Sequence, residues 1–398
     1  MSVTKMIIRE QYLRKIRPFY DTDPVKVIPG IRRCGKSVVL SQIASEIRKK
    51  TDNIIYLNFE RTSDFNQAST PDMLLEYVKK NRKDGKCYIF LDEIQEMESW
   101  QVAVKDLRLD NNSVFISGSN SKLLSSEILS LLSGRFVNFR IRPFVYVEME
   151  EYLKQLGRAA DINDYLIWGG FPGRFEYESF DAKKNYLADL ENTIVYNDLI
   201  RRYKIRKEVP FKKIVNFILM SNSRIISARS IQKYVSKECE GISINTVLKY
   251  IECLKEAYIV DQVPRYSNKA KKSMSYYYKF YDGDVCFNSL LVYNNRYDLD
   301  HNLENIVYNE LLFRGYDLKV FDNGGKEIDF YACKDGKEYF VQVAYSVLDG
   351  KAYGREFGAF VGVNPLAQKI LITTDDVDYS TSLVRHIKFK DFLHMESL

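Results

Sequence analysis

Residues 30–37 read Gly30-Ile31-Arg32-Arg33-Cys34-Gly35-Lys36-Ser37, which matches the pattern G-x-x-x-x-G-K-[ST] at all four fixed positions. Residues 25–28 before this stretch predict a short strand, and residues 37–48 after it predict a helix with one apolar face. A glycine loop between a strand and a helix is the context that a phosphate-binding loop requires. Motif and context together favour this interpretation over an ordinary glycine-rich turn.

The chemistry of the loop suits a nucleoside triphosphate. Glycines let successive backbone N–H groups point at an anion, and the positive end of the next helix dipole lies at the same place. Lys36 is expected to reach the β- and γ-phosphates, and the Ser37 hydroxyl is expected to ligate Mg²⁺. We therefore predict that the segment from Gly30 to Val38 binds ATP, with Mg²⁺ as a second cofactor.

An acidic pair ends a second apolar run. Residues 86–91 predict a buried strand that leads directly into Asp92 and Glu93. The carboxyl ends of parallel strands face the ligand crevice of an open α/β sheet, so Asp92 is placed to hold Mg²⁺. Glu93 is placed to orient and deprotonate an attacking water. Taken alone, the pair could be a solvated strand end; together with the loop it predicts an ATP-hydrolysing site.

A third strand, residues 114–117, is expected beside the one that ends at Asp92, and it leads into Asn120. Asn120 is predicted to hydrogen-bond the γ-phosphate or the attacking water. The alternative is a helix N-cap, where Ser and Asn are preferred. Asn58, which follows another strand run, is a candidate to restrain Glu93. The alternation of strands and helices over residues 20–142 predicts a mostly parallel sheet.

Composition narrows the class of protein. A chain of 398 residues with 45% hydrophobic and 28% charged residues predicts two or three globular domains. No apolar run approaches the roughly 18 residues of a membrane span, and no signal peptide is evident, so a cytoplasmic protein without a membrane partner is expected. The six cysteines form no C-x-x-C pair and only three histidines exist, which argues against a zinc site and implies no disulfides.

Cations are concentrated in two segments. Residues 201–213 carry seven cations and one anion, and residues 265–279 carry five cations and no anion, interleaved with tyrosines. Both segments could neutralise phosphates, so DNA contact through residues 201–279 is a candidate function. A solvated charged face is the alternative.

The segment between these cations predicts a winged-helix module. Residues 209–266 read as helix, turn, helix and then strand, an order in which the second helix enters the major groove of DNA. On this interpretation Ser243, Asn245, Thr246 and Lys249 face DNA. The alternative is a helical module used only for contacts within or between chains.

Two turn signals lie elsewhere in the chain. The glycines of residues 168–173 suggest backbone positions with positive φ in a lid, a hinge or a simple packing turn. Asp335-Gly336 predicts a β-hairpin turn. The predicted division is an ATPase core at 1–145, a helical lid or linker at 146–205, a winged-helix module at 206–285 and a further α/β domain at 286–398.

The whole chain resembles a prokaryotic family of AAA-type ATPases that pair an N-terminal P-loop module with a C-terminal domain of long-unknown function. The motifs that carry the resemblance are Gly30–Arg33, Leu91–Gln95, Ser117–Ser121, Ser133–Arg135, Gly169–Pro172, Glu304–Asn305 and Glu327–Phe330. In such ATPases an arginine at the place of Arg135 often senses the γ-phosphate, in cis or from a neighbouring subunit. The resemblance thus implies a catalytic role for Arg135 and a homo-oligomer; a strand-edge cation is the alternative.

The C-terminal domain is similar to the restriction-endonuclease fold, whose active form has a helix Glu, a strand Asp and Glu-x-Lys on the next strand. Glu304 and Asp329 match the first two, but the third element reads Gln342-Val343-Ala344. Ala344 cannot replace a lysine that polarises water and phosphate. The resemblance therefore implies the fold without an expected nuclease activity.

Three functions follow from these patterns. The first is a Mg²⁺-dependent ATPase that acts as a nucleotide-controlled switch, with DNA as the candidate target. The second is a DNA nuclease regulated by ATP. The third is a DNA-binding regulator that holds nucleotide without hydrolysing it.

Overall fold

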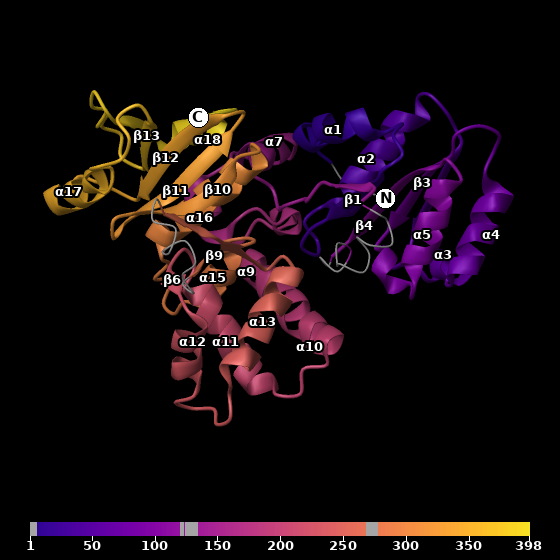
Figure 1. The fold of residues 1–398 in the computed structure, drawn as a ribbon, viewed down its shortest axis with the longest axis horizontal. Coiled ribbons are helices and arrows are strands. Elements are labelled where there is room, and N and C mark those ends of the chain that lie inside the picture. Colours follow the sequence, from indigo (N-terminus) through magenta and orange to yellow (C-terminus); the bar gives the residue numbers. More distant parts are fainter. Residues whose placement is uncertain (1–5, 120–122, 124–133, 268–277) are drawn as a thin grey trace. The chain divides into compact units, whose positions relative to one another are not determined.

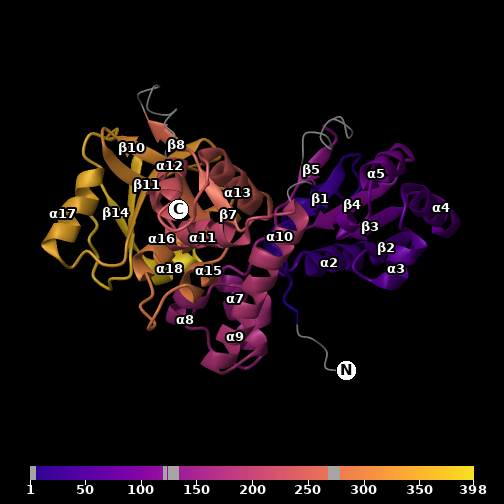
Figure 2. The ribbon, with the colours of Figure 1, turned by 90° about the horizontal axis from the view of Figure 1, so that it is seen from below.

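The computed structural model describes residues 6–119, 123, 134–267 and 278–398 (Figures 1 and 2). The chain forms two compact units. Unit 1 comprises the chain up to residue 143 together with residues 256–258, and unit 2 comprises residues 144–255 and 259–398. None of the helices in the described ranges is long and apolar enough to cross a lipid bilayer.

Unit 1 is built on a five-stranded sheet in the order β2-β3-β4-β1-β5, in which every pairing is parallel. Its elements are α1 (Glu10–Ile16), η1 (Arg17–Phe19), β1 (Val25–Pro29), α2 (Lys36–Arg48), β2 (Ile54–Asn58), α3 (Thr62–Gln67), α4 (Pro71–Asn81), β3 (Tyr88–Asp92), η2 (Ile94–Glu96), α5 (Trp100–Leu109), β4 (Ser113–Gly118) and β5 (Phe136–Asn138). The predicted parallel sheet is confirmed, and so is the position of β4 beside β3.

Side chains on the two faces of this sheet pack against different helices. Ile89 and Leu91 of β3 belong to the core that α4 and α5 cover. Phe90 points the other way, as alternation along a strand requires, and its ring stacks on Phe115 with centroids 4.6 Å apart. Figure 2 shows α2 and α5 on opposite sides of the sheet. The sheet is therefore buried on both faces, which explains the apolar runs in its strands.

Unit 2 begins with helices and continues into two sheets. Its helices are α7 (Tyr146–Gln155), α8 (Ile162–Trp168), η4 (Pro172–Glu176), α9 (Phe180–Glu191), the π-helix η5 (Asn192–Asn197), α10 (Asp198–Tyr203), α11 (Glu208–Met220), α12 (Ala228–Val235), α13 (Ile244–Glu256), α15 (Cys286–Leu290), α16 (Leu299–Phe313), α17 (Gly350–Ala359) and α18 (Phe389–His394). Its strands are β6 (Ile225–Ile226), β7 (Val260–Val263), β8 (Arg265–Ser267), β9 (Tyr278–Asp282), β10 (Asp317–Asn323), β11 (Lys326–Lys334), β12 (Lys337–Ala344), β13 (Gln368–Thr373) and β14 (Arg385–Lys388).

The two sheets of unit 2 differ in pairing. The smaller sheet is antiparallel, in the order β6-β9-β7, and accompanies helices α11, α12 and α13. The larger sheet has six strands in the order β14-β13-β12-β11-β10-β8; β10, β11 and β12 pair antiparallel, and the other pairings are parallel. Helix α16 packs on β10 and β12 and also contacts β9.

The turn predictions are only partly right. Asp335 and Gly336 connect β11 to β12 with φ of 50° and 75°, as the hairpin prediction requires. In the glycine turn only Gly169 has positive φ, at 63°. Gly170 and Gly173 are needed for space instead, because an added Cβ would lie 1.9 Å from the Phe144 carbonyl oxygen and 2.2 Å from the Tyr186 hydroxyl, respectively.

Candidate functional site

The predicted phosphate loop connects β1 to α2 at the carboxyl edge of the unit 1 sheet. Its glycines are required by geometry. A Cβ on Gly30 would lie 2.2 Å from the carbonyl oxygen of Ile141, and Gly35 has φ of 102° just before the first helical residue. Arg33 also adopts positive φ, at 64°, which is uncommon for a residue with a side chain. The loop is thus folded tightly at the helix N-terminus, where backbone N–H groups lack partners within the helix.

The two predicted magnesium ligands lie against each other. Ser37, in the first turn of α2, lies near the Asp92 carboxylate at the end of β3, and its hydroxyl acts to lower the pKa of that carboxyl. Asp92 is fully buried, and it accepts hydrogen bonds from the Ser117 hydroxyl and, at 3.0 Å, from the Asn58 amide. Burial raises the pKa of Asp92 above its usual value. A hydroxyl and a carboxylate side by side are the oxygen donors that Mg²⁺ takes, so the donor set fits this ion.

Lys36 and Glu93 form a buried ion pair in the same place. The Lys36 ammonium lies 3.1 Å from Glu93 Oε1 and donates to the Ile31 carbonyl at 3.3 Å. Burial would lower the pKa of Lys36, but the carboxylate of Glu93 outweighs it and the pKa lies above its usual value. Burial would raise the pKa of Glu93, but the charge of Lys36 outweighs it and holds the Glu93 pKa below its usual value. Both groups are therefore charged at neutral pH.

Glu93 is held by two further groups. Its Oε2 accepts from the Gln95 amide at 2.7 Å and from the backbone N–H of Ser119 at 3.2 Å. Gln95 Oε1 is buried without a hydrogen-bond partner in the described part of the chain. The expectation that Asn58 restrains Glu93 is wrong: its amide bonds Asp92, because β2 pairs with β3 in a register that sets Asn58 opposite Asp92. The hydrogen bond to Glu93 that was expected from Asn58 is made by Gln95 instead.

Sequence reasoning also missed Arg9. This buried arginine donates from Nη1 to the carbonyl oxygens of Cys34 and Arg142, each at 3.0 Å, and so ties the loop to the segment after β5. It lies ahead of β1 and outside every motif, so no local signal marks it. Cys34 itself is buried, its Sγ donates to the Ile141 carbonyl at 3.3 Å, and burial raises its pKa. Cys34 is thus a packing residue of the loop.

Two further predicted site residues are Asn120 and Arg135. Asn120 lies outside the described residues. Arg135 lies at the opposite edge of the sheet, since its carbonyl accepts from the N–H of Val25 at the start of β1 and its side chain is 3.9 Å from Asp23. The prediction that Arg135 contacts the nucleotide of its own chain is therefore not supported, because a parallel β5–β1 pairing puts it away from the carboxyl ends. A role toward a neighbouring copy stays a prediction.

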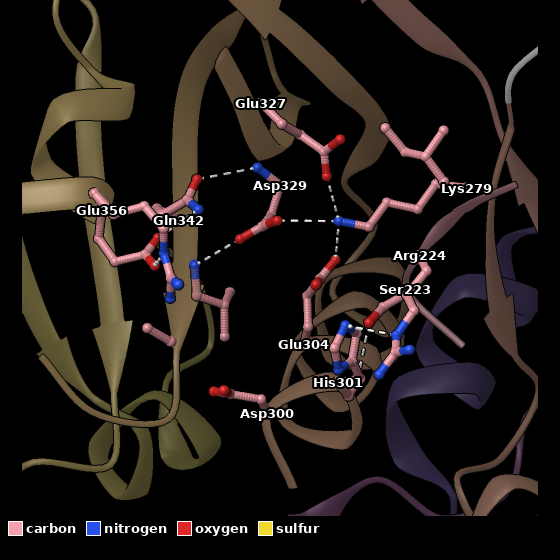
Figure 3. Close-up of a pocket in the computed structure, with 14 residues that line it drawn as sticks. Ser223, Arg224, Lys279, Asp300, His301, Glu304, Glu327, Asp329, Gln342 and Glu356 are labelled. Carbon is pink, nitrogen blue, oxygen red and sulfur yellow. Dashed lines mark hydrogen bonds and ion pairs between the residues drawn. The ribbon is translucent and has the colours of Figure 1, made fainter. Parts of the chain in front are cut away.

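A second cluster of ionisable groups lies in unit 2 (Figure 3). The ammonium of Lys279 on β9 is 2.6 Å from Glu304 of α16, 2.8 Å from Glu327 and 3.0 Å from Asp329, both of β11. Lys279 closes the basic stretch 265–279, but it is only 3% exposed and is paired with these carboxylates instead of facing solvent. Burial, reinforced by the charge of Asp329, raises the pKa of Glu304 to about 8.

Sequences of known families and relatives match most of this chain. A family described as an AAA domain matches residues 22–150, and a domain of unknown function, DUF8612, matches residues 159–294. An uncharacterized protein of Haemophilus influenzae is 32% identical over 384 residues, which cover 92% of this chain and 93% of the relative. The uncharacterized protein MJ1544 of Methanocaldococcus jannaschii is 31% identical over 349 residues, covering 81% and 75%.

Among solved structures, the Walker-type ATPase PABY2304 of Pyrococcus abyssi is similar to this chain with a TM-score of 0.53. The two are 16% identical, and the alignment covers 72% of this chain and 96% of that one. At this identity the similarity concerns the fold. The AAA domain match includes both the loop at 30–37 and the acidic pair at 92–93.

Proposed function

This chain belongs to the family of its Haemophilus and Methanocaldococcus relatives and carries an AAA-type ATPase domain. From that premise we propose that it binds ATP with Mg²⁺ and hydrolyses the γ-phosphate bond as a nucleotide-controlled switch. The observation that carries this proposal is the convergence of Lys36, Ser37, Asp92 and Glu93 at one edge of the sheet. Lys36 and Ser37 begin helix α2, whereas Asp92 and Glu93 lie at the end of β3. Together the four side chains would supply a phosphate cation, a magnesium donor pair and a base.

Each group has one task in the proposed reaction. The loop N–H groups and Lys36 bind the phosphates, and Ser37 with Asp92 hold Mg²⁺, which when bound neutralises charge on the phosphates. Glu93 accepts the proton of the attacking water. Its present pairing with Lys36 occupies both groups, so phosphate binding has to draw Lys36 away before Glu93 can act as a base. Nucleotide thereby activates its own hydrolysis.

The test is phosphate release by the purified full chain, measured with and without DNA. We expect turnover in the wild type that requires Mg²⁺ and is lost in Lys36→Ala, which removes the phosphate cation. Lys50→Ala, an exposed lysine just beyond α2, is the control and should keep the wild-type rate. A wild type that neither binds nor hydrolyses ATP under both conditions would contradict the proposal.

A second candidate function is DNA contact by unit 2. Helices α11, α12 and α13 with the antiparallel sheet β6-β9-β7 support a winged-helix module within residues 206–285, followed by a restriction-endonuclease-like domain at 286–398. Asn245 and Lys249 are exposed on α13, and Arg206 and Lys207 are exposed just before α11. Exposed cations beside an exposed helix favour phosphate contact.

Fluorescence anisotropy with labelled duplex DNA tests this second function. The double variant Arg206→Glu/Lys207→Glu should weaken binding about tenfold or more at 100 mM salt, and wild-type affinity should fall steeply as salt rises. Lys80→Glu in α4 changes charge elsewhere and serves as the control. Equal DNA affinities of wild type, the double variant and Lys80→Glu would exclude Arg206 and Lys207 as DNA contacts.

A further inference from the structure

A pocket of about 430 Å³ lies in unit 2 at the amino ends of β13 and β14. Its lining comes from two neighbouring segments of the chain: Pro365, Ala367–Ile370 and Ser380–Arg385. Val343, whose N–H bonds Asp329 of the Lys279 cluster, pairs with Ile372 near the carboxyl end of β13. The pocket is therefore separate from the Lys279 cluster.

Lys369 is a buried cation in the wall of this pocket. It is only 6% exposed, yet its ammonium has no hydrogen bond and no ion pair within the described residues. It shares a face of β13 with Leu371, which belongs to an apolar cluster with Phe340 and Val384. The stem of the lysine is thus covered by apolar groups, while the ammonium keeps access to solvent. Lysine is rarely buried to this extent without a partner, so the position favours an anion as that partner.

The pocket carries positive charge that its lining does not balance. Arg385, the second cation, is exposed, and its side chain makes no ion pair within the part of the chain that the structure describes. Among the described residues that line the pocket there is no Asp or Glu. Asp378 lies outside the lining and is held by the Ser380 N–H at 2.9 Å, with His386 Nδ1 3.7 Å away. Two cations without an acid favour a dianion, and phosphate is the dianion that Arg and Lys commonly bind.

The turn that leads into β14 adds hydroxyl groups in a fixed geometry. Thr381 donates its N–H to the Val384 carbonyl at 2.9 Å, and its hydroxyl oxygen accepts from the N–H groups of Leu383 at 3.2 Å and Val384 at 3.0 Å. The oxygen is the acceptor in both side-chain bonds, so the hydroxyl proton is left to donate. Ser382 supplies a second hydroxyl in the same turn. Phosphate oxygens are acceptors that such hydroxyls suit.

The remaining wall of the pocket is largely apolar, with contributions from Pro365, Ala367, Ile370, Leu383 and Val384. Apolar walls with a few polar groups, enclosing several hundred Å³, are typical of sites for small organic molecules. We propose that this pocket binds a small organic phosphate monoester, with its phosphate on Lys369, Arg385 and the Thr381 hydroxyl and its organic group on the apolar wall. The site is independent of the phosphate loop in unit 1 and of the Lys279 cluster.

Calorimetric titration with phenyl phosphate tests this site. The full chain carries Lys36→Ala, so the phosphate loop does not contribute to the binding that is measured. We expect Lys369→Met to weaken binding at least about tenfold, because methionine keeps the apolar stem but loses a charge-assisted hydrogen bond. Arg385→Ala, at an exposed position, should weaken binding as well.

Lys337→Met is the matched control, since Lys337 is an exposed lysine of β12 that lines no part of the pocket. It should leave the affinity for phenyl phosphate unchanged. Affinity in Lys369→Met or in Arg385→Ala equal to that of the control would overturn the proposal. Absence of binding at millimolar phenyl phosphate would also overturn it, because Lys369 would then be a lysine that only reaches solvent.

Benzoate tests the assignment of phosphate within the same titration. It carries the same ring with a single negative charge, so it should bind more weakly than the phosphate ester. Benzoate binding as tightly as phenyl phosphate would overturn the phosphate assignment.

Acetylation of lysines by acetic anhydride locates the ligand in the wild-type chain without any substitution in the pocket. Peptide mass spectrometry should show loss of labelling at Lys369 in the presence of phenyl phosphate and unchanged labelling at Lys337. Labelling of Lys369 that phenyl phosphate does not reduce would contradict binding at this pocket.

Discussion

At the residue scale, the nucleotide site is a set of opposed charges held by a few neutral groups. Lys36 and Glu93 neutralise each other, and Asp92 is surrounded by hydroxyl and amide donors. Gln95 is the group that the motif analysis did not assign, and its amide fixes the carboxylate of Glu93 at 2.7 Å. Gln95 is therefore a positioning residue for Glu93.

Replacing Gln95 with Ala should lower the turnover number for ATP about tenfold or more and leave the affinity for nucleotide nearly unchanged. The reason is that small misplacements of a base reduce rate strongly, whereas Gln95 has no bond to the phosphate loop. Steady-state kinetics and equilibrium binding of a labelled nucleotide separate the two effects. Gln67→Ala, at an exposed position in α3, is the control. A loss of affinity equal to the loss of rate would contradict the positioning role.

At the element scale, the turn from β1 into α2 depends on a close approach of two backbones. The segment after β5 runs beside the loop, with the Ile141 N–H donating to the Pro29 carbonyl at 2.8 Å. Gly30 fits under the Ile141 carbonyl because it has no side chain. The strand–loop–helix order could be predicted from the motif, but this contact could not, because it joins residues that no spacing rule relates.

Gly30→Ala should destabilise unit 1 by about 1–3 kcal/mol, the usual cost of overpacking, and should abolish nucleotide binding. The matched control is Gly354→Ala, since Gly354 lies inside α17 with open space around its Cα. There the substitution should raise stability by up to about 1 kcal/mol through helix propensity. Thermal unfolding of both variants, with and without ATP, is the measurement. Wild-type nucleotide binding by Gly30→Ala would show that the loop does not need the close approach.

A second element, β1, carries a buried lysine in its middle. Lys26 is fully buried and donates to the Thr22 carbonyl at 2.7 Å and to the Ser113 hydroxyl at 2.9 Å, and burial lowers its pKa to about 7. An unfolded lysine titrates near pH 10.4, so between pH 7 and pH 10 the unfolded chain binds more protons than the folded one. The contribution of Lys26 to stability therefore rises with pH over this range.

Urea unfolding of wild type and Lys26→Met at pH 7 and pH 9 measures this contribution. The difference in free energy of unfolding should shift in favour of wild type by about 1–2 kcal/mol at pH 9, since each pH unit contributes at most about 1.4 kcal/mol. Titration of other groups cancels in the comparison. An identical difference at both pH values would mean that Lys26 stays protonated in the folded chain.

At the scale of the whole molecule, the sequence was most informative where local chemistry repeats a known pattern. The parallel sheet, the loop and the acidic pair of unit 1 follow from short motifs and strand order. The Lys279 cluster does not, because its lysine and its carboxylates come from β9, α16 and β11, and only the folded chain brings them together. The position of Arg135 could not be predicted for a related reason: its place in a motif did not reveal at which end of β1 it would lie.

The two units thus carry two clusters of different character: the loop at 30–37 with the Lys36–Glu93 ion pair in unit 1, and the Lys279 cluster in unit 2. The contacts of each cluster lie within its own unit. A substitution in one cluster therefore leaves the contacts of the other cluster intact.

The central claim is that Glu93 activates water for attack on a nucleotide held by Lys36. The most direct measurement compares ATP binding and phosphate release in wild type and Glu93→Gln. Glu93→Gln is expected to bind ATP with Mg²⁺ still and to release phosphate at least about a hundredfold more slowly, the usual contribution of a general base. Unchanged phosphate release in Glu93→Gln would contradict it.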